Sequence, residues 1–192
     1  MRRIHWRATA HRGDLMVRQE EEEASPDAMV VLDRAAAHWP RPGDDPDPGF
    51  EAAVSLCASA ALRLMQDGYS VDVVDAGGTL LGALRGHEDD RDSLLAALAT
   101  VAPRGEARDI RTIVGGTPPG PLVFITGRLD EEAAGRLSTA GAAAPLLFAV
   151  DPAPGAIAAA TRRRWHAATL DPAGDLAEIW HDALPTFGVS GV

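Results

Sequence analysis

The chain alternates between short apolar runs and longer segments in which apolar residues recur every three or four positions. The short runs predict strands at 28–33, 69–76, 122–126, 145–151 and 165–171. Most of them, such as "AMVVLD" and "LVFIT", are continuously apolar and do not alternate with polar residues. This pattern is typical of strands that are buried on both faces of a parallel sheet.

The periodic segments predict helices between these strands, at 50–68, 89–101, 129–141, 154–164 and 173–184. Gly68 closes the first of them, where a glycine commonly ends a helix. Strand and helix therefore follow one another along most of the chain, which predicts an α/β fold with a mainly parallel, doubly wound sheet in three layers, a Rossmann-like arrangement.

Two departures from the alternation are expected. Glycines 77 and 78 separate the strand 69–76 from the apolar run "TLLGAL", which favours a β-hairpin. Four prolines within "PRPGDDPDPG" predict a surface loop before the first long helix. We expect two parts, an N-terminal arm with a short strand over residues 1–24 and the α/β domain over residues 25–192.

The charge of the chain limits its partners. The 18 basic residues are all arginine, and 28 acidic residues leave a net charge of −10. A surface that neutralises nucleic-acid phosphates must be concentrated and positive, so nucleic acid is not an expected partner. Without lysine, neither a P-loop nor a Schiff-base enzyme is feasible.

Cysteine and hydropathy narrow the classes further. The single cysteine, Cys57, stands between apolar neighbours, so we expect a buried thiol and neither a disulfide nor a Cys-x-x-Cys zinc site. No apolar stretch reaches the length of about 18 residues that spans a bilayer. We therefore expect a cytoplasmic chain. His38 has no candidate partner in the sequence pattern, so we expect it to be an ordinary surface or core residue.

Several acidic residues and a threonine lie at the predicted strand ends, where ligands bind in doubly wound sheets. These residues are Asp33, Asp75, Thr126, Asp151 and Asp171. The simplest interpretation is that the aspartates start loops or cap helices. The "GHEDD" segment (86–90) has the composition of a metal cluster, but its spacing favours a solvated helix start.

A strand that ends in "VVLD" near the start of such a domain resembles a von Willebrand factor A domain. The resemblance implies a divalent-cation site, which in that family uses Asp-x-Ser-x-Ser, a threonine and a further aspartate. Here Asp33 is present, but Ala35 and Ala37 replace the two serines, leaving Thr126 and Asp130 as the remaining candidate ligands. Magnesium needs oxygen ligands, so we expect no cofactor, or at most weakly bound Mg²⁺.

The opening stretch "RRIHWRATAHRGDLMVRQEEEE" resembles the family called domain of unknown function 58. The matching pieces are Arg3-x-x-Trp6, Ala8-Thr9-Ala10 and Leu15-Met16-Val17-Arg18. In that family a Tyr-x-x-Gly-Asp motif precedes such a segment, and a von Willebrand A-like domain follows it. Because the Tyr-x-x-Gly-Asp half is absent, we expect an N-terminally truncated member. We expect the similarity to cover all 192 residues.

The resemblance implies a partner and not a reaction. Members are associated with MoxR-type AAA ATPases in assembly or cell-envelope processes, and full-length relatives are usually membrane-anchored. Arginine and tryptophan are the residue types that most often carry interface energy. The candidate partner-binding residues are therefore in the arm: Arg3, Trp6, Arg7, Arg12 and Arg18.

Three functions remain open at this point. The first is a non-catalytic protein-interaction domain that works with such an ATPase. The second is a divalent-cation-dependent ligand-binding module of the von Willebrand A type, with Asp33, Thr126 and Asp130 as its ligands. The third, a small enzyme, rests only on analogy between folds, and we do not expect enzymatic activity.

Overall fold

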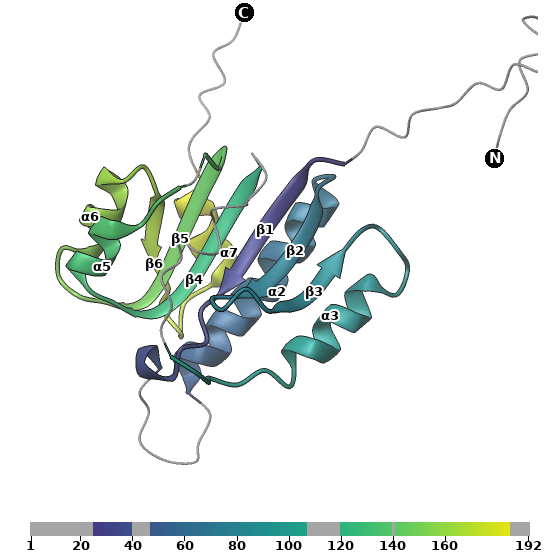
Figure 1. The fold of residues 1–192 in the computed structure, drawn as a ribbon, viewed down its shortest axis with the longest axis horizontal. Coiled ribbons are helices and arrows are strands. Elements are labelled where there is room, and N and C mark those ends of the chain that lie inside the picture. The colour runs from purple at the N-terminus through teal and green to yellow at the C-terminus, as the bar shows by residue number, and fades with distance from the viewer. Residues whose placement is uncertain (1–24, 40–46, 107–119, 140, 185–192) are drawn as a thin grey trace, which may run out of the picture.

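The computed structural model describes residues 25–39, 47–106, 120–139 and 141–184. Six strands form one sheet in the order β3-β2-β1-β4-β5-β6 (Figure 1). They are β1 (Asp27–Leu32), β2 (Ser70–Asp75), β3 (Leu80–Leu84), β4 (Pro121–Leu129), β5 (Ala144–Pro152) and β6 (His166–Thr169). All neighbouring pairs are parallel except β2 and β3, which form the expected antiparallel hairpin.

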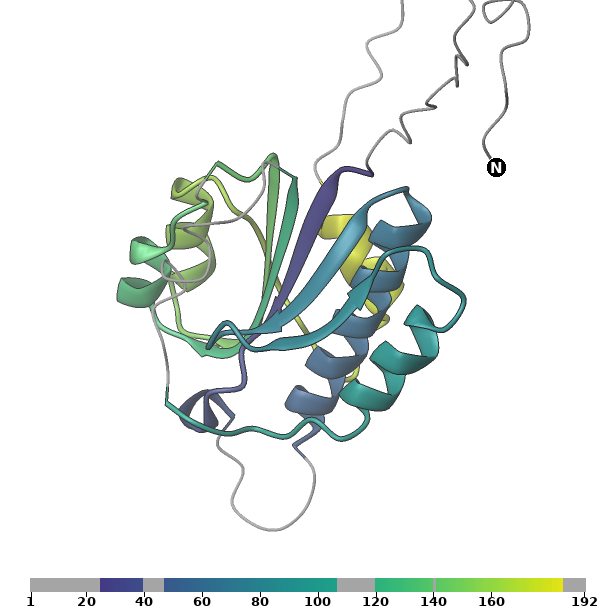
Figure 2. The same cartoon turned by 45° about the vertical axis from the view of Figure 1, so that its right-hand side comes forward.

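Helices cover both faces of the sheet, so the predicted three-layer, Rossmann-like α/β architecture is confirmed (Figures 1 and 2). One face carries α2 (Pro48–Gln66), α3 (Asp90–Leu98) and α7 (Leu176–Ala183). The other carries α5 (Glu131–Arg136) and α6 (Ala156–Arg162). A three-residue 3-10 helix, η1 (Ala36–His38), follows β1 and was not predicted.

The continuous apolar runs supply both cores because successive strand residues point to opposite faces. Val30 packs on the side of α2, whereas its neighbour Val31 packs on the side of α5 and α6. Both side chains have no exposed surface. In β1, Val31 is in register with Val74 of β2 and with Phe124 of β4. The strand β1 therefore has a neighbour on each side and lies near the middle of the sheet.

The start and the end of α2 follow from particular residues. The Asp47 carboxylate accepts hydrogen bonds from the Gly49 and Phe50 amides, at 2.8 and 3.3 Å, and Pro48 occupies the first helical position, where no amide hydrogen is needed. Gly68 ends the segment with φ of +93°, as expected for a glycine after a helix. Cys57 of this helix is buried, as predicted.

The predicted bounds of the helices and strands differ from the observed ones, most of all around β4. Among the described residues, the helix expected over 129–141 is observed as Glu131–Arg136, and it begins late because β4 continues to Leu129. Thr126 therefore lies inside a strand and not at its end.

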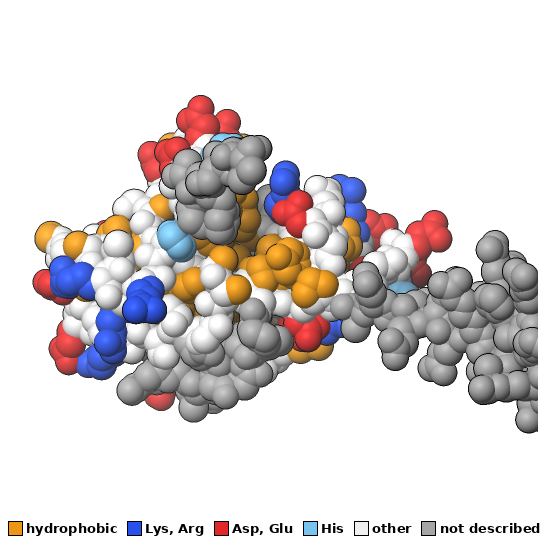
Figure 3. Space-filling model, turned by 90° about the horizontal axis from the view of Figure 1, so that it is seen from above, with side chains coloured by type: hydrophobic (Ala, Val, Ile, Leu, Met, Phe, Trp, Pro, Cys, Tyr) orange, Lys and Arg blue, Asp and Glu red, His pale blue; other side chains and the backbone are white. Residues whose placement is uncertain are grey.

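The surface at the end of the molecule where β1 begins mixes acidic and basic side chains at its margins, with apolar side chains between them (Figure 3).

Candidate functional site

Asp33 lies directly after β1. The chain continues from β1 to β2 on one side and later adds β4 on the other side, so the strand order reverses at β1. This is the position at which doubly wound folds bind ligands. Asp33 is 3% exposed. Its Oδ1 accepts a hydrogen bond from the Ala35 amide at 2.9 Å, and its Oδ2 accepts one from the Thr126 hydroxyl at 2.7 Å. The same Oδ2 lies 2.5 Å from Nδ1 of His38.

We call Asp33, His38 and Thr126 the Asp33 network. The structure brings together Asp33 and Thr126, which are 93 residues apart in the chain, as the metal-site hypothesis requires. It adds His38, which the sequence pattern left without a partner. The available signal was the five-residue spacing between an aspartate that ends a strand and a histidine that follows it.

The chain returns to Asp33 through η1. The His38 amide donates to the Ala35 carbonyl oxygen at 2.9 Å, and the Trp39 indole Nε1 donates to the Asp33 carbonyl oxygen at 2.9 Å. The Trp39 ring meets Phe50 of α2 edge to face, at 5.1 Å between centroids. These contacts hold His38 over the end of β1.

Gly127 of β4 permits this close approach. A Cβ atom at position 127 would overlap the His38 carbonyl oxygen and would lie 2.9 Å from the Trp39 ring. Real Cβ contacts are essentially never that short. The turn of η1 therefore rests against bare backbone of β4, and only glycine leaves room for it.

The surroundings of His38 raise the pKa of its imidazole. The hydrogen bond to Asp33 raises the pKa of His38 most, partial burial opposes this, and the negative charges of Asp33 and Asp130 raise it further. When His38 is protonated, its imidazole places a positive charge against the Asp33 carboxylate.

The donor set does not fit a divalent cation. Both oxygens of Asp33 already accept hydrogen bonds, and Ala35 and Ala37 offer no side-chain oxygen. Asp130, the third candidate ligand, caps α5 by accepting from the Ala133 amide at 2.6 Å. Within the described ranges, no group of three or more His, Cys, Asp or Glu side chains is arranged to hold a metal ion.

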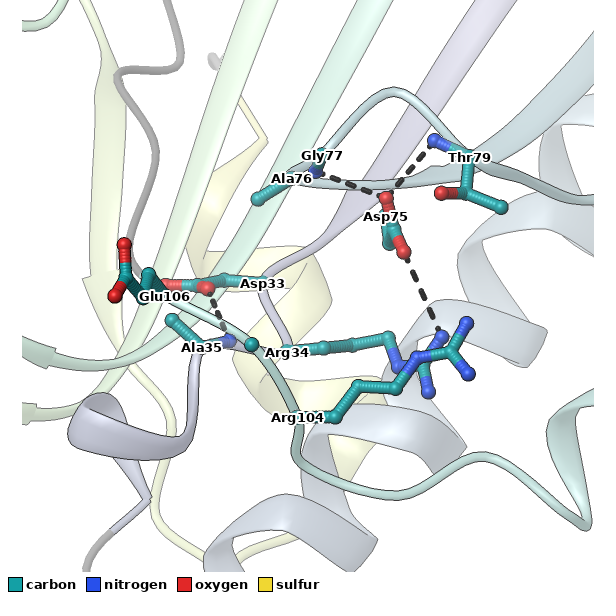
Figure 4. Close-up of a pocket in the computed structure, with 10 residues that line it drawn as sticks. Asp33, Arg34, Ala35, Asp75, Ala76, Gly77, Thr79, Arg104 and Glu106 are labelled. Carbon is teal, nitrogen blue, oxygen red and sulfur yellow. Dashed lines mark hydrogen bonds and ion pairs between the residues drawn. The ribbon is translucent and has the colours of Figure 1, made fainter.

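Beside the Asp33 network lies a pocket of about 240 Å³ at the carboxyl ends of β1 and β2 (Figure 4). Its polar walls come from Asp33, Arg34, Asp75, Thr79, Arg104 and Glu106. Asp75 was a candidate from the sequence, but the two arginines were not, because Arg34 takes a variable position of the Asp-x-Ser-x-Ser pattern and Arg104 comes from a separate loop without a motif.

Main-chain hydrogen bonds fasten the two loops that form this pocket. The Arg104 amide donates to the Arg34 carbonyl oxygen at 2.6 Å, and the Ala36 amide donates to the Gly105 carbonyl oxygen at 3.3 Å. Arg34 itself is 5% exposed, so its guanidinium is a buried cation.

Two of the other candidate aspartates accept hydrogen bonds from loop amides, as the simplest interpretation expects, whereas Asp151 lies within β5. Asp75 accepts from two amides of the hairpin turn, and Asp171 accepts from the Ala173 amide at 2.9 Å. Asp151 forms an exposed ion pair with Arg128. In the "GHEDD" segment, amides of Arg85 and His87 donate to Asp90, and these hydrogen bonds lower the pKa of its carboxyl group.

The candidate partner-binding residues of the arm lie outside the described residues. These are Arg3, Trp6, Arg7, Arg12 and Arg18, all within the range 1–24. Among the described helices, none is both long and apolar enough to cross a membrane.

Two von Willebrand factor A domains are among the solved structures that resemble this fold. The crystal structure of the SpRpn10 VWA domain is 14% identical with a TM-score of 0.49, over 81% of this chain and 93% of that one. A von Willebrand factor type A protein from Catenulispora acidiphila is 13% identical with a TM-score of 0.46, over 83% of this chain and 41% of that one. The comparison with curated proteins gives no match.

The family comparison is more specific. The model described as "Protein of unknown function DUF58" matches residues 1–116, which include the arm, the Asp33 turn and the arginine pocket. We expected the similarity to extend over all 192 residues, and the match ends at 116. Because the match covers more than half of the chain, this protein belongs to the DUF58 family.

Proposed function

We propose that the chain is a non-catalytic protein-interaction domain that works with a MoxR-type AAA ATPase. The observation that carries the proposal is the Asp33 network, in which the carboxylate at the usual ligand position is compensated by the protein's own donors. A domain built in this way presents a fixed surface without needing a metal ion to complete it.

The geometry of the network supports a role without catalysis. In a hydroxyl–histidine–carboxylate triad the imidazole stands between the acid and the nucleophile and takes its proton. Here the Thr126 hydroxyl and the His38 ring both meet Oδ2 of Asp33, so the hydroxyl proton is directed to the carboxylate. The imidazole therefore does not activate Thr126 as a nucleophile.

A co-purification experiment tests the proposal. The intact chain and a variant without residues 1–20, each carrying a C-terminal tag, would be expressed in their native cells and isolated with their partners. We expect mass spectrometry to find a MoxR-type ATPase with the intact chain and less of it with the shortened one. Failure to recover an ATPase with either chain would remove the proposal.

A divalent-cation-dependent module is the second candidate, favoured by the 2.7 Å contact between Thr126 and Asp33. Calorimetric titration with Mg²⁺ and Mn²⁺ separates the two candidates. We expect no heat of binding at millimolar metal, because protein donors occupy both Asp33 oxygens. Saturable binding that Asp33→Asn abolishes would favour the second candidate.

A further inference from the structure

The pocket beside the Asp33 network contains more positive than negative charge at one end. Arg34 Nε and Nη2 donate to the Ala102 carbonyl oxygen, at 3.1 and 2.9 Å. Its Nη1 lies 3.6 Å from Oδ2 of Asp75, a distance longer than that of a charge-assisted hydrogen bond. Arg34 is thus held firmly in place, but its charge is only loosely paired.

A second guanidinium lies beside the first. The backbone hydrogen bond between Arg104 and Arg34 brings the two side chains alongside each other, and Figure 4 shows their guanidinium groups next to Asp75. Burial lowers the pKa of Arg34 most, and repulsion from Arg104 lowers it more than attraction to Asp75 raises it. Arg34 therefore has one carboxylate, Asp75, and a second cation, Arg104, as its charged neighbours.

The remaining acids do not neutralise this end. Asp75 is already engaged, since its Oδ1 accepts from the Gly77 and Thr79 amides, each at 2.9 Å. Asp33 is compensated within its own network. Glu106 projects from the opposite side of the pocket, away from the two guanidinium groups (Figure 4).

We propose that the Arg34–Arg104 pocket binds a carboxylate group, with Arg104 as the principal contact and Arg34 as the buried charge behind it. Guanidinium groups match carboxylates in geometry and offer two parallel donors. If the proposed function holds, the carboxylate belongs to an aspartate or glutamate side chain of the partner protein. The same chemistry would also accept a small carboxylic acid.

The size of the pocket agrees with a single side chain. Its volume of about 240 Å³ is below the roughly 300–1,000 Å³ of sites that enclose drug-sized ligands. It lies at the carboxyl ends of β1 and β2, and its lining residue Arg104 has an exposed side chain.

The experiment uses Arg104→Gln, which removes an exposed charge without touching the buried Arg34. The matched control is Arg163→Gln, the same substitution at an exposed arginine directly after α6, which packs against β5 and β6. The probes are the peptide acetyl-Gly-Glu-Glu-Gly-amide, its glutamine counterpart, and glutarate. Each would be titrated into the full chain while the arginine Nε–H resonances are recorded by NMR.

We expect the glutamate peptide to shift the resonances of Arg34 and Arg104, and the glutamine peptide to leave them unchanged. Arg104→Gln should weaken binding about tenfold, whereas Arg163→Gln should not. Tighter binding of the peptide than of glutarate identifies a protein side chain as the source, and the reverse identifies a small acid. No shift at millimolar peptide and glutarate overturns the inference.

Its failure can be distinguished from failure of the proposed function. If the ATPase co-purifies equally with the intact chain and with Arg104→Gln, and no probe binds, the pocket inference is wrong and the interaction stands. If the probes bind as expected and no ATPase is recovered, the carboxylate site stands and the proposed partner is wrong.

Discussion

At the scale of single residues, His38 shows the effect of side-chain charge, and Arg164 shows the effect of backbone conformation. His38 lies half-buried against a carboxylate that is nearly inaccessible to solvent. Arg164 is the only described residue other than glycine with a positive φ, at +68°. Each leads to a measurable expectation.

The pairing of His38 should make stability depend on pH. Because the folded state raises the pKa of His38 above its ordinary value of 6.5, its contribution is fully present below pH 6.5. It is lost as the pH rises through the raised pKa. Between pH 5.5 and 8.5, the free energy of unfolding measured with denaturant should fall by about 1 kcal/mol more for the intact chain than for His38→Gln. Parallel curves for the two proteins would contradict the pairing.

Replacing Arg164 by glycine should stabilise the fold. Arg164 follows α6 in the left-handed conformation, its amide donates to Thr161 and the next amide donates to Ala160. Glycine is the usual residue at this position because it has no Cβ to oppose a positive φ. We expect Arg164→Gly to raise the free energy of unfolding by about 0.5–1 kcal/mol. Arg163→Gly, where φ is −89°, is the control and should not stabilise.

At the scale of elements, the contact between η1 and β4 decides where His38 stands. Three residues of 3-10 helix have no hydrophobic period, so the sequence pattern gave no sign of η1. The long helix α2 and the strands β1 and β5, by contrast, were predicted because their apolar residues recur over many positions. The site is less predictable than the fold because its members meet only after β1 and β4 pair.

Gly127→Ala tests this contact between elements. The added methyl group would overlap the His38 carbonyl oxygen and press on the Trp39 ring. We expect a loss of about 3 kcal/mol in the free energy of unfolding, measured by urea titration. Gly135→Ala is the matched control in α5, where a Cβ meets nothing within 4 Å, and should be neutral or stabilising. Equal stability of both variants would show that η1 is free to move away from β4.

At the scale of the whole molecule, the net charge of −10 acts on all parts of the domain at once. Repulsion among distant acids opposes the compact state, and salt screens separations longer than about 10 Å most effectively. Short ion pairs such as Arg63–Asp67, at 3.0 Å, are screened less. The balance therefore favours folding at higher ionic strength.

We expect the melting temperature to rise between 20 and 200 mM NaCl, by an amount that corresponds to about 1 kcal/mol or less. Differential scanning calorimetry at constant pH measures the shift. Binding of the glutamate peptide should change in the opposite direction and weaken as salt is added, because the contact is an attraction between opposite charges. A melting temperature that falls with salt would show that local ion pairs outweigh the long-range repulsion.

The burial of Cys57 has a practical consequence. It is the only thiol of the chain, it has no exposed surface, and burial raises its pKa to about 12. A thiol-specific reagent can reach it only when α2 separates from the sheet, so the rate of modification reports how often the core opens. The natural chain thus contains its own opening probe, and a cysteine introduced on the surface could be labelled selectively without first removing it.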